Sequence, residues 1–371
     1  MTTRVYARPF TPLRALGAVA LLVLALAPAT SQAAPQTSKK AIWGPAVVDG
    51  KSQFPLYKDL GVGIYQRSVA WDKTASRRPA NPTDPSDPAY DWPADLDGIV
   101  AAARGSGMDV LIEVQSTPGW ANGGKPSSYA PKRPGDVAAF MTALSRRYPA
   151  VRYWMIWSEP TRNDRFLPMP AERRGHPLTR RQQRAPRLYA RVLDASYAAL
   201  KSVDGGDQVV GGNTFTSGVI SPRNWIRYLR LPNGKPPRMD LYGHNPFTAR
   251  PPDLKRRRLS DGFADFSDLD TLHGWVRHSL RRGGQTPKLY LSEFFTPTDH
   301  PNYEFNFWVS RKTQARWLGA AMRIVRHHGY IHTMGVFAYD DPPRPGGDEV
   351  NRGLLTYDGH RKRAYRAFRS G

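Results

Sequence analysis

The chain contains no cysteine among its 371 residues, which excludes disulfide bonds, thiol catalysis and cysteine-ligated metal centres. Its nine histidines never adopt the His-Glu-x-x-His spacing of a zinc site, so we expect no catalytic metal and no cofactor. No Gly-x-Gly-x-x-Gly segment follows an early apolar run, which argues against an open dinucleotide-binding sheet. The chemistry left open is that of carboxylates and polar side chains.

Long hydrophobic runs are scarce as well. The longest, Ala15–Ala27, follows three arginines and precedes the small-x-small segment Ser31-Gln32-Ala33. This order is typical of a secretory signal peptide over residues 1–33, and the run falls short of the ~20 apolar residues that cross a bilayer. An uncleaved anchor is the alternative. We therefore predict an exported protein, secreted or in the cell envelope, whose domain spans residues 34–371 and has no stable membrane span.

Acidic residues are few beside basic ones: 31 Asp and Glu against 54 Lys and Arg give a formal net charge of +23. Such a charge attracts anionic polymers, including acidic polysaccharide, teichoic acid and nucleic acid. The basic residues, however, form short groups such as Arg256-Arg257-Arg258 and Arg361-Lys362-Arg363, without a long basic helix that carries aromatics. The pattern favours a solvated basic surface and predicts no specific nucleic-acid partner.

Short apolar runs alternate with amphipathic stretches along the whole mature chain. Three stretches repeat apolar residues at helical spacing: Asp136–Tyr148, Arg187–Leu200 and Gln314–Arg326. Eight such strand–helix units predict a single-domain α/β fold, a closed (β/α)₈ TIM barrel with a parallel sheet. The predicted strands are Ala41–Gly44, Gly63–Val69, Asp109–Val114, Tyr153–Trp157, Gln208–Gly212, Asp240–Tyr242, Lys288–Leu291 and Ile331–Phe337.

Acidic and aromatic side chains gather where the predicted strands end. Glu159 follows the fourth strand and Glu293 the seventh, so both should lie at the carboxyl face of the barrel. Two paired carboxylates can cleave a glycosidic bond, one as acid and the other as base or nucleophile. The remaining exits offer hydrogen-bonding groups and large rings, a mixture that suits sugars. The predicted substrate-binding residues are Arg67, Trp120, Trp157, Ser158, Asn213, His244 and Tyr339.

Four segments resemble motifs of the clan A glycoside hydrolases, the retaining (β/α)₈ superfamily. Tyr153–Pro160 resembles the fourth-strand Trp-Asn-Glu-Pro motif, and Leu289–Phe294 resembles the seventh-strand nucleophile motif. Asp240–Phe247 is similar to the sixth-strand histidine region, and Arg352–Gly359 to the Gly-Leu…Asp-Gly segment. The four occur in the family order and cover nearly all of the mature chain. Family 39 and the cellulase-like families are the most similar.

The resemblance implies a role for several residues. Glu159 matches the general acid/base and Glu293 the nucleophile, while Arg67 matches an arginine that keeps the nucleophile ionised. His244 matches a histidine that contacts the acid/base or the substrate, and Tyr339 takes the place of a tryptophan platform.

Two residues depart from the family pattern. Ser158 stands where the family has the asparagine that binds the sugar 2-hydroxyl, and Phe247 stands where a tyrosine is usual. Ser158 opens the alternative of a catalytically weak or inactive carbohydrate-binding barrel. A barrel that binds anionic polymers through charge alone is a third option.

Several residues also have a structural interpretation. The two glutamates could begin helices, Arg67 could be an ion-pair partner and His244 a rim residue, and at least one of the aromatic candidates could cap the core. Glu113, inside the third strand, is interpreted as a buried structural carboxylate. The arginine-rich loops Asn163–Gln183 and Arg250–Ser267 favour an oligo- or polysaccharide substrate with an acidic sugar. We expect a monomer.

Overall fold

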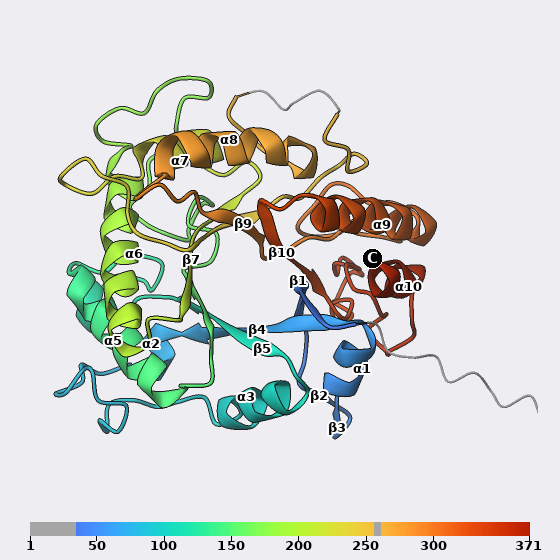
Figure 1. Ribbon diagram of the computed structural model, residues 1–371, viewed down its shortest axis with the longest axis horizontal. Coiled ribbons are helices and arrows are strands. Elements are labelled where there is room, and N and C mark those ends of the chain that lie inside the picture. Colours follow the sequence, from blue (N-terminus) through green and yellow to red (C-terminus); the bar gives the residue numbers. More distant parts are fainter. Residues whose placement is uncertain (1–34, 256–260) are drawn as a thin grey trace, which may run out of the picture. The chain divides into compact units, whose positions relative to one another are not determined.

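Eight parallel strands close into a barrel in the computed structural model, which describes residues 35–255 and 261–371 (Figure 1). The circular order is β1, β10, β9, β8, β7, β6, β5 and β4, and β1 pairs with both β10 and β4. The predicted (β/α)₈ barrel is therefore confirmed. The barrel strands are β1 (Thr37–Trp43), β4 (Val62–Ala70), β5 (Asp109–Gln115), β6 (Tyr153–Ile156), β7 (Gln208–Phe215), β8 (Leu241–Asn245), β9 (Lys288–Leu291) and β10 (Ile331–Phe337).

Helices surround the barrel, and neighbours such as α5 and α6 or α9 and α10 pack against each other (Figure 1). Helix starts are set locally: the Ser310 hydroxyl accepts a hydrogen bond from the Thr313 backbone and caps α9. The main helices are α1 (Phe54–Asp59), α3 (Leu96–Gly105), α5 (Pro134–Arg147), α6 (Arg184–Val203), α7 (Pro222–Tyr228), α8 (Leu269–Leu280), α9 (Arg311–His327) and α10 (Arg363–Ser370). Short elements are the hairpin β2 (Val47–Val48) and β3 (Lys51–Ser52), α2 (Trp71–Thr74), α4 (Gly119–Asn122) and η1 (Phe266–Asp268).

The barrel interior changes from apolar to polar along the strands. Its apolar layer consists of Ala41, Ile64, Leu111, Tyr153, Met155, Val210, Leu241 and Tyr290. Side chains two positions apart in a strand point the same way, so the next inward residues after Ile64, Leu111 and Tyr290 are Gln66, Glu113 and Ser292. These polar side chains form a floor below the carboxyl ends of the strands, where barrel enzymes place their chemistry.

All eight predicted strands are present, with ends that differ by a few residues. β1 starts four residues before the predicted Ala41, and β7 continues three residues beyond the predicted end at Gly212, to Phe215. Gly212 and Asn213 have positive φ angles of 85° and 39°, and the pairing of β7 with β8 shifts register at this point. The strand thus bulges and resumes, a feature that the apolar pattern alone does not mark.

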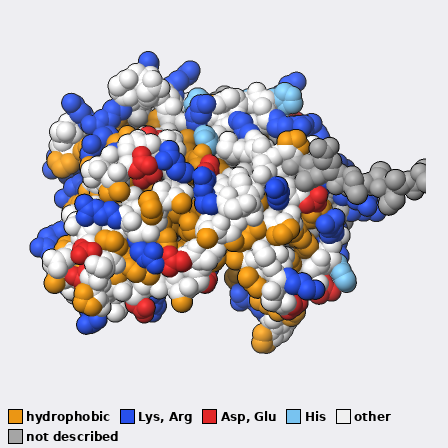
Figure 2. Space-filling model, turned by 60° about the horizontal axis from the view of Figure 1, so that its bottom comes forward, with side chains coloured by type: hydrophobic (Ala, Val, Ile, Leu, Met, Phe, Trp, Pro, Cys, Tyr) orange, Lys and Arg blue, Asp and Glu red, His pale blue; other side chains and the backbone are white. Residues whose placement is uncertain are grey.

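Two predictions lie outside the described residues. The signal peptide over residues 1–33 is one, and the basic group Arg256-Arg257-Arg258 is the other. Among the described residues no helix is both long and apolar enough to cross a membrane. On the face shown in Figure 2, Lys and Arg side chains are scattered, with Asp and Glu between them.

Candidate active site

Strained backbone marks the strand ends at the carboxyl face. Ser116, Trp157, Glu159 and Asn213 have φ angles of 68°, 73°, 41° and 39°. The left-handed region costs a residue other than glycine about 1–3 kcal/mol, and such residues cluster at functional sites. The four other described residues of this kind are all aspartates, which tolerate the region better. The strain therefore gathers around Glu159.

Glu159 is buried, and both of its carboxylate oxygens have partners. Asn245 Nδ2 donates a hydrogen bond to Oε1 over 2.8 Å, and Arg162 Nη1 donates to Oε2 over 2.9 Å. Arg162 follows Glu159 by three residues and also pairs with Glu304 over 2.9 Å. The carboxylate at the exit of β6 is thus fixed in one orientation by contacts from β8 and from its own loop.

A polar floor beneath Glu159 links residues from four strands, β9, β8, β7 and β5. Ser292 Oγ lies 2.8 Å from Asn245 Oδ1 and 3.2 Å from Asn213 Oδ1. Asn213 Nδ2 in turn donates to Glu113 Oε2 over 3.5 Å. All four residues are buried, so each hydrogen bond replaces one lost to water. The network connects Glu113 to Asn245 and hence to Glu159.

Glu113 is a third carboxylate of this centre. Ser68 Oγ donates to it over 2.9 Å, and Ser158 also hydrogen bonds to it. Burial is the main cause that raises the pKa of Glu113 to about 7, and the charge of Glu159 acts in the same direction. The interpretation of Glu113 as buried agrees with its position. Its contacts add that it is connected to the two predicted catalytic glutamates.

The Glu293 carboxyl lies among other acids at the exit of β9. Burial raises its pKa well above the usual range for glutamate, and the charges of Glu159 and Glu113 raise it further. Arg352 is the cation that opposes this shift. Because the charge of Glu159 acts on Glu293, the two predicted catalytic carboxylates lie close enough to interact.

The backbone before Glu293 is held from two sides. Trp43 Nε1 and Gln66 Nε2 donate to the Ser292 carbonyl over 2.9 and 3.2 Å. A Cβ atom on Gly335 of β10 would lie 2.1 Å from the same oxygen, so only glycine permits this approach. The position of Glu293 is therefore set by rigid barrel strands rather than by a loop.

A second layer of charges covers the carboxylates at the mouth. Arg352 pairs with Asp341 over 2.6 Å and lies 3.9 Å from Glu304, which pairs with Arg162. Together with the three inner glutamates, this cluster holds five carboxyl groups and two guanidinium groups. Both arginines are already paired with acids. The site therefore has no surplus positive charge, although the whole chain is strongly basic.

Two predicted site residues face away from the barrel interior. Arg67 lies between the inward residues Gln66 and Ser68, and its guanidinium pairs with Asp95, just before α3, over 3.0 Å. The arginine whose charge acts on Glu293 is instead Arg352. The role that the resemblance implies for Arg67 thus has no support from its position.

His244 lies between the barrel wall and the outer layer. Its Nδ1 lies 2.8 Å from Thr214 Oγ1 and its Nε2 lies 3.0 Å from the Ala264 carbonyl. The residue is fully buried, and burial lowers its pKa to about 4, so the ring is neutral. Its neighbour Asn245 points inward and contacts Glu159, which is the role that the resemblance gave to His244.

The predicted aromatic platforms make hydrogen bonds outside the carboxylate network. Trp157 is buried against Phe166 and donates its indole hydrogen to the Arg165 carbonyl over 2.7 Å. Trp120 donates to the Ala75 carbonyl over 2.7 Å, and Tyr339 donates to Gln53 over 2.5 Å. Of the seven predicted substrate-binding residues, the structure brings Ser158 and Asn213 into the carboxylate network, where Ser158 contacts Glu113. The prediction did not select Asn245, Arg162, Glu304 or Arg352.

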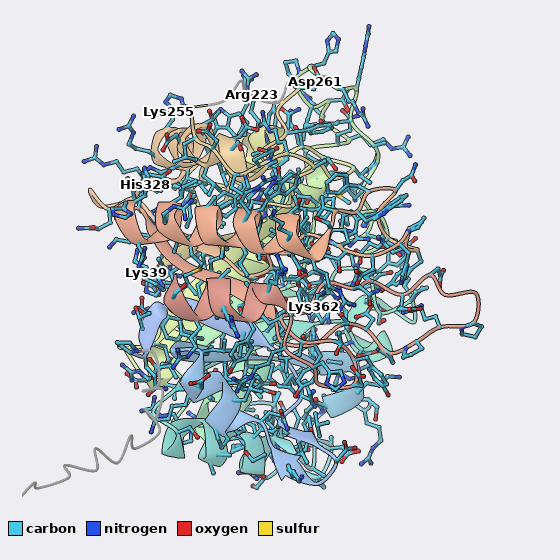
Figure 3. The ribbon with its side chains drawn as sticks, turned by 90° about the vertical axis from the view of Figure 1, so that its right-hand side faces the viewer. Lys39, Arg223, Lys255, Asp261, His328 and Lys362 are labelled. Carbon is cyan, nitrogen blue, oxygen red and sulfur yellow. The ribbon has the colours of Figure 1, made fainter. Side chains whose placement is uncertain are left out.

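A buried ion pair anchors the loops that carry Arg352 and Asp341. Lys362 Nζ lies 2.9 Å from Asp340 Oδ1 and also donates to Thr298 Oγ1 over 3.1 Å. Burial lowers the pKa of Lys362 and raises that of Asp340, so the pairing has to offset the desolvation of both groups. Figure 3 shows Lys362 at the start of α10, at the opposite end of the barrel from Lys39 and His328.

We expect Lys362→Met to lower the free energy of unfolding by about 3–5 kcal/mol, because it leaves the Asp340 carboxylate buried without its cation. Urea unfolding followed by circular dichroism measures the change. Lys312→Met, on the exposed start of α9, is the matched control and should change stability by less than about 0.5 kcal/mol. A loss below about 1 kcal/mol in Lys362→Met would show that the pair does not anchor the loops.

No family model matches the sequence, and no curated protein matches it. Solved structures do share its fold. A family 39 glycoside hydrolase from Bacteroides cellulosilyticus superposes with a TM-score of 0.65 at 15% identity, over 90% of this chain and 63% of that chain. A monomeric β-xylosidase from Caulobacter crescentus gives a TM-score of 0.58 at 18% identity, over 91% of this chain and 68% of that chain.

A β-glucuronidase from Bacteroides uniformis is a third similar structure, with a TM-score of 0.53 at 12% identity, over 91% of this chain and 35% of that chain. The chain thus spans less than two thirds of the family 39 structure and about a third of the β-glucuronidase. At these identities the likeness shows the fold alone, a (β/α)₈ barrel. Within the described part of the chain, no cluster of His, Asp and Glu is arranged to hold a metal ion.

Proposed function

We propose that the chain is an exported retaining glycoside hydrolase, with Glu159 as general acid/base and Glu293 as nucleophile. The observation that carries the proposal is that the charge of Glu159 acts on Glu293, while a buried polar network at the carboxyl face connects Glu159 to Ser292, the residue before Glu293. The barrel that the chain shares with glycoside hydrolases supports the reaction class. Signal-dependent export and a monomeric state remain part of the proposal.

In the first proposed step, the Glu293 carboxylate attacks the anomeric carbon while Glu159 gives its proton to the departing glycosidic oxygen. A covalent glycosyl-enzyme ester forms and the aglycone leaves as an alcohol. In the second step Glu159 removes a proton from water, the water oxygen attacks the same carbon, and the ester bond to Glu293 breaks. The sugar leaves with its original anomeric configuration, and both glutamates return to their starting states.

The resting site has to rearrange before this chemistry. Arg162 is paired with Glu159, and the raised pKa of Glu293 favours a proton on the nucleophile. The double displacement needs the reverse distribution, with the proton on Glu159. We therefore propose that substrate entry separates Arg162 from Glu159, and that Glu304, its second partner, then holds the guanidinium. The proton that the resting site holds on Glu293 can then move to Glu159.

The charge balance of the site favours a neutral sugar over the acidic sugar that the arginine-rich loops suggest. Arg250, from one of these loops, pairs with Asp265 and Asp268, and Arg162, directly before the other loop, pairs with Glu159 and Glu304. A uronate carboxylate would enter a cluster in which carboxyl groups outnumber guanidinium groups, and it would be repelled. The proposed substrate is an oligo- or polysaccharide, or a glycoside, of a neutral sugar.

A screen of 4-nitrophenyl glycosides tests the reaction class. The panel holds α- and β-linked neutral hexoses and pentoses together with glucuronide and galacturonide. The double variant Glu159→Gln/Glu293→Gln serves as the blank. We expect hydrolysis of at least one neutral glycoside above the blank, with little on the uronides. Equal rates for the wild-type chain and the blank on every substrate would contradict the proposal.

The second candidate is a catalytically weak or inactive carbohydrate-binding barrel. Ser158 supports it, because its hydroxyl is bound to Glu113 and no amide at this position is free for a sugar 2-hydroxyl. The same screen, combined with a glycan array, separates the two. Saturable binding of a glycan without turnover favours the second candidate. Binding that salt abolishes, and that both glutamate substitutions leave unchanged, would point to charge-driven capture of an anionic polymer instead.

A further inference from the structure

A collar of phenylalanines lies directly above the carboxylate layer. Phe215 follows Asn213 by two residues, Phe247 follows Asn245 by two, and Phe295 follows Glu293 by two. Three neighbouring strand exits therefore place a phenylalanine one step further toward the mouth than a residue of the polar site. Phe305, from the segment after β9, and Phe337, at the end of β10, complete the phenylalanine collar.

The rings of the phenylalanine collar pack as one cluster. The Phe247 ring centroid lies 4.7 Å from Phe295, 5.4 Å from Phe215 and 5.5 Å from Phe305. The Phe295 centroid lies 5.5 Å from Phe337. Beside them opens a pocket of about 530 Å³, whose wall includes Phe215, Phe247, Phe295, Phe305, Phe307 and Pro297. Its volume falls within the range of small-molecule binding sites.

Two arginines join the phenylalanine collar to the carboxylates. The Arg162 guanidinium lies 5.1 Å from the centre of the Phe215 ring while it pairs with Glu159. Arg352 lies 4.3 Å from the centre of Phe337 and 5.4 Å from Phe295. Phe215 lines the pocket, and Arg162 contacts both Phe215 and Glu159, so these two residues connect the pocket to Glu159. In the proposed reaction Glu159 protonates the departing oxygen, so the leaving group lies on this side.

The threonine hydroxyls and the charged groups of the pocket wall are engaged within the protein. The Thr216 hydroxyl lies 3.0 Å from the carbonyl oxygens of Asn245 and Phe247. The Thr248 hydroxyl donates to the Arg250 carbonyl or the Asp265 carboxylate, and Arg250 and Asp265 pair with each other. A sugar bound here would lose hydrogen bonds to water and find few replacements, whereas an apolar group would lose none.

We propose that this pocket is a subsite for an apolar leaving group, so that the substrate is a glycoside of a hydrophobic aryl or alkyl alcohol. The description of the pocket as a leaving-group subsite rests on the proposed function, whereas the apolar pocket itself does not depend on hydrolysis. Phenylalanine rings without hydroxyl groups favour contact with a hydrophobic surface. The sugar ring occupies the polar carboxylate layer below, and the aglycone extends between the rings of the phenylalanine collar.

Binding of N-phenyl-1-naphthylamine, an uncharged fluorescent probe, tests the pocket without any knowledge of the sugar. We expect saturable binding to one site on the wild-type chain. Phe305→Ala removes one wall, and Ala249→Trp fills the pocket from an exposed position without loss of a core contact. Both should weaken binding at least about tenfold. Trp308→Ala, an exposed aromatic residue in the same segment as Phe305, is the matched control and should bind the probe normally.

Glu293→Gln separates the two proposals, since it should keep probe binding while any hydrolysis is lost. If hydrolysis is found, Phe305→Ala should raise KM for the 4-nitrophenyl glycoside at least about fivefold and leave KM for the methyl glycoside of the same sugar within about twofold. Absence of saturable probe binding, or equal binding by wild type, Phe305→Ala and Ala249→Trp, would overturn the apolar subsite. Probe binding without turnover of any glycoside would leave the subsite standing and reject the hydrolase.

Discussion

Replacement of Glu293 by glutamine is expected to lower kcat/KM on the best aryl glycoside by about 10³-fold or more, because an amide cannot form the glycosyl ester. The substitution keeps the shape of the side chain, and glutamine is neutral like the protonated Glu293 that burial and Glu159 favour in the resting site. Folding should therefore be preserved, which circular dichroism verifies. Initial rates with the wild type and the variant at several pH values measure the effect.

Glu172→Gln is the matched control for this experiment. Glu172 accepts hydrogen bonds from Asn224 and Ser221, away from the carboxylate cluster, so its substitution should leave kcat/KM within about twofold. If Glu293→Gln retained activity within about tenfold of the wild type, another residue would have to supply the nucleophile. The double-displacement assignment would then be wrong.

The second large effect concerns stability. Burial raises the pKa of Glu113 from 4.5 to about 7, so folding favours its protonated form. The stability contributed by this carboxyl is fully present below pH 4.5 and is lost as the pH rises through about 7. A shift of this size corresponds to about 3 kcal/mol of pH-dependent stability. Glu113→Gln should remove that part of the pH dependence. The free energy of unfolding of the variant, relative to that of the wild type, should therefore increase between pH 5 and pH 8.

Urea unfolding of both proteins at pH 5 and pH 8 measures this difference. Glu113→Ala provides the comparison, since it removes the same titration but also leaves a cavity and unpaired Ser68 and Asn213 groups. It should be destabilised at both pH values. An unchanged pH dependence in Glu113→Gln would show that Glu113 does not titrate in this range in the folded protein.

The strand–helix alternation was sufficient to predict the barrel. Apolar runs such as Tyr153–Trp157 and Leu289–Leu291 are continuous because strands of a parallel barrel are buried on both faces, and each is followed by a helix with one apolar side. The bulge at Gly212 and Asn213 was not predictable in the same way. It depends on two residues with positive φ and on the register against β8, which only the assembled barrel defines.

The two carboxylates could be predicted, but most of their neighbours could not. The sequence places His244 and Asn245 at the same strand exit, and adjacent residues of a strand point to opposite faces. Without the register of β8, nothing decides which of them faces Glu159. Arg67 was misplaced for the same reason, since its inward neighbours are Gln66 and Ser68. Arg162 carried a usable signal, because it lies three residues after Glu159.

Long-range contacts explain the remaining omissions. Arg352 and Glu304 reach the site from loops after β10 and β9. Glu304 pairs with Arg162, and the charge of Arg352 acts on Glu293, but neither relation is visible in the sequence. Trp120 and Trp157 carry rings that suit a sugar, but each indole hydrogen bonds to a backbone carbonyl within the protein. A residue type shows what a side chain can bind, whereas its role depends on which partners the fold brings to it.

Covalent labelling tests the central claim most directly. The wild-type chain is incubated with a panel of 2-deoxy-2-fluoro glycosides that carry a dinitrophenolate leaving group, which trap the glycosyl-enzyme of retaining glycosidases. We predict a mass increase of one fluoroglycosyl unit on the peptide that contains Glu293, and no increase in Glu293→Gln. A glycoside that is hydrolysed without any label on Glu293, or a label on Glu159 instead, would contradict the account.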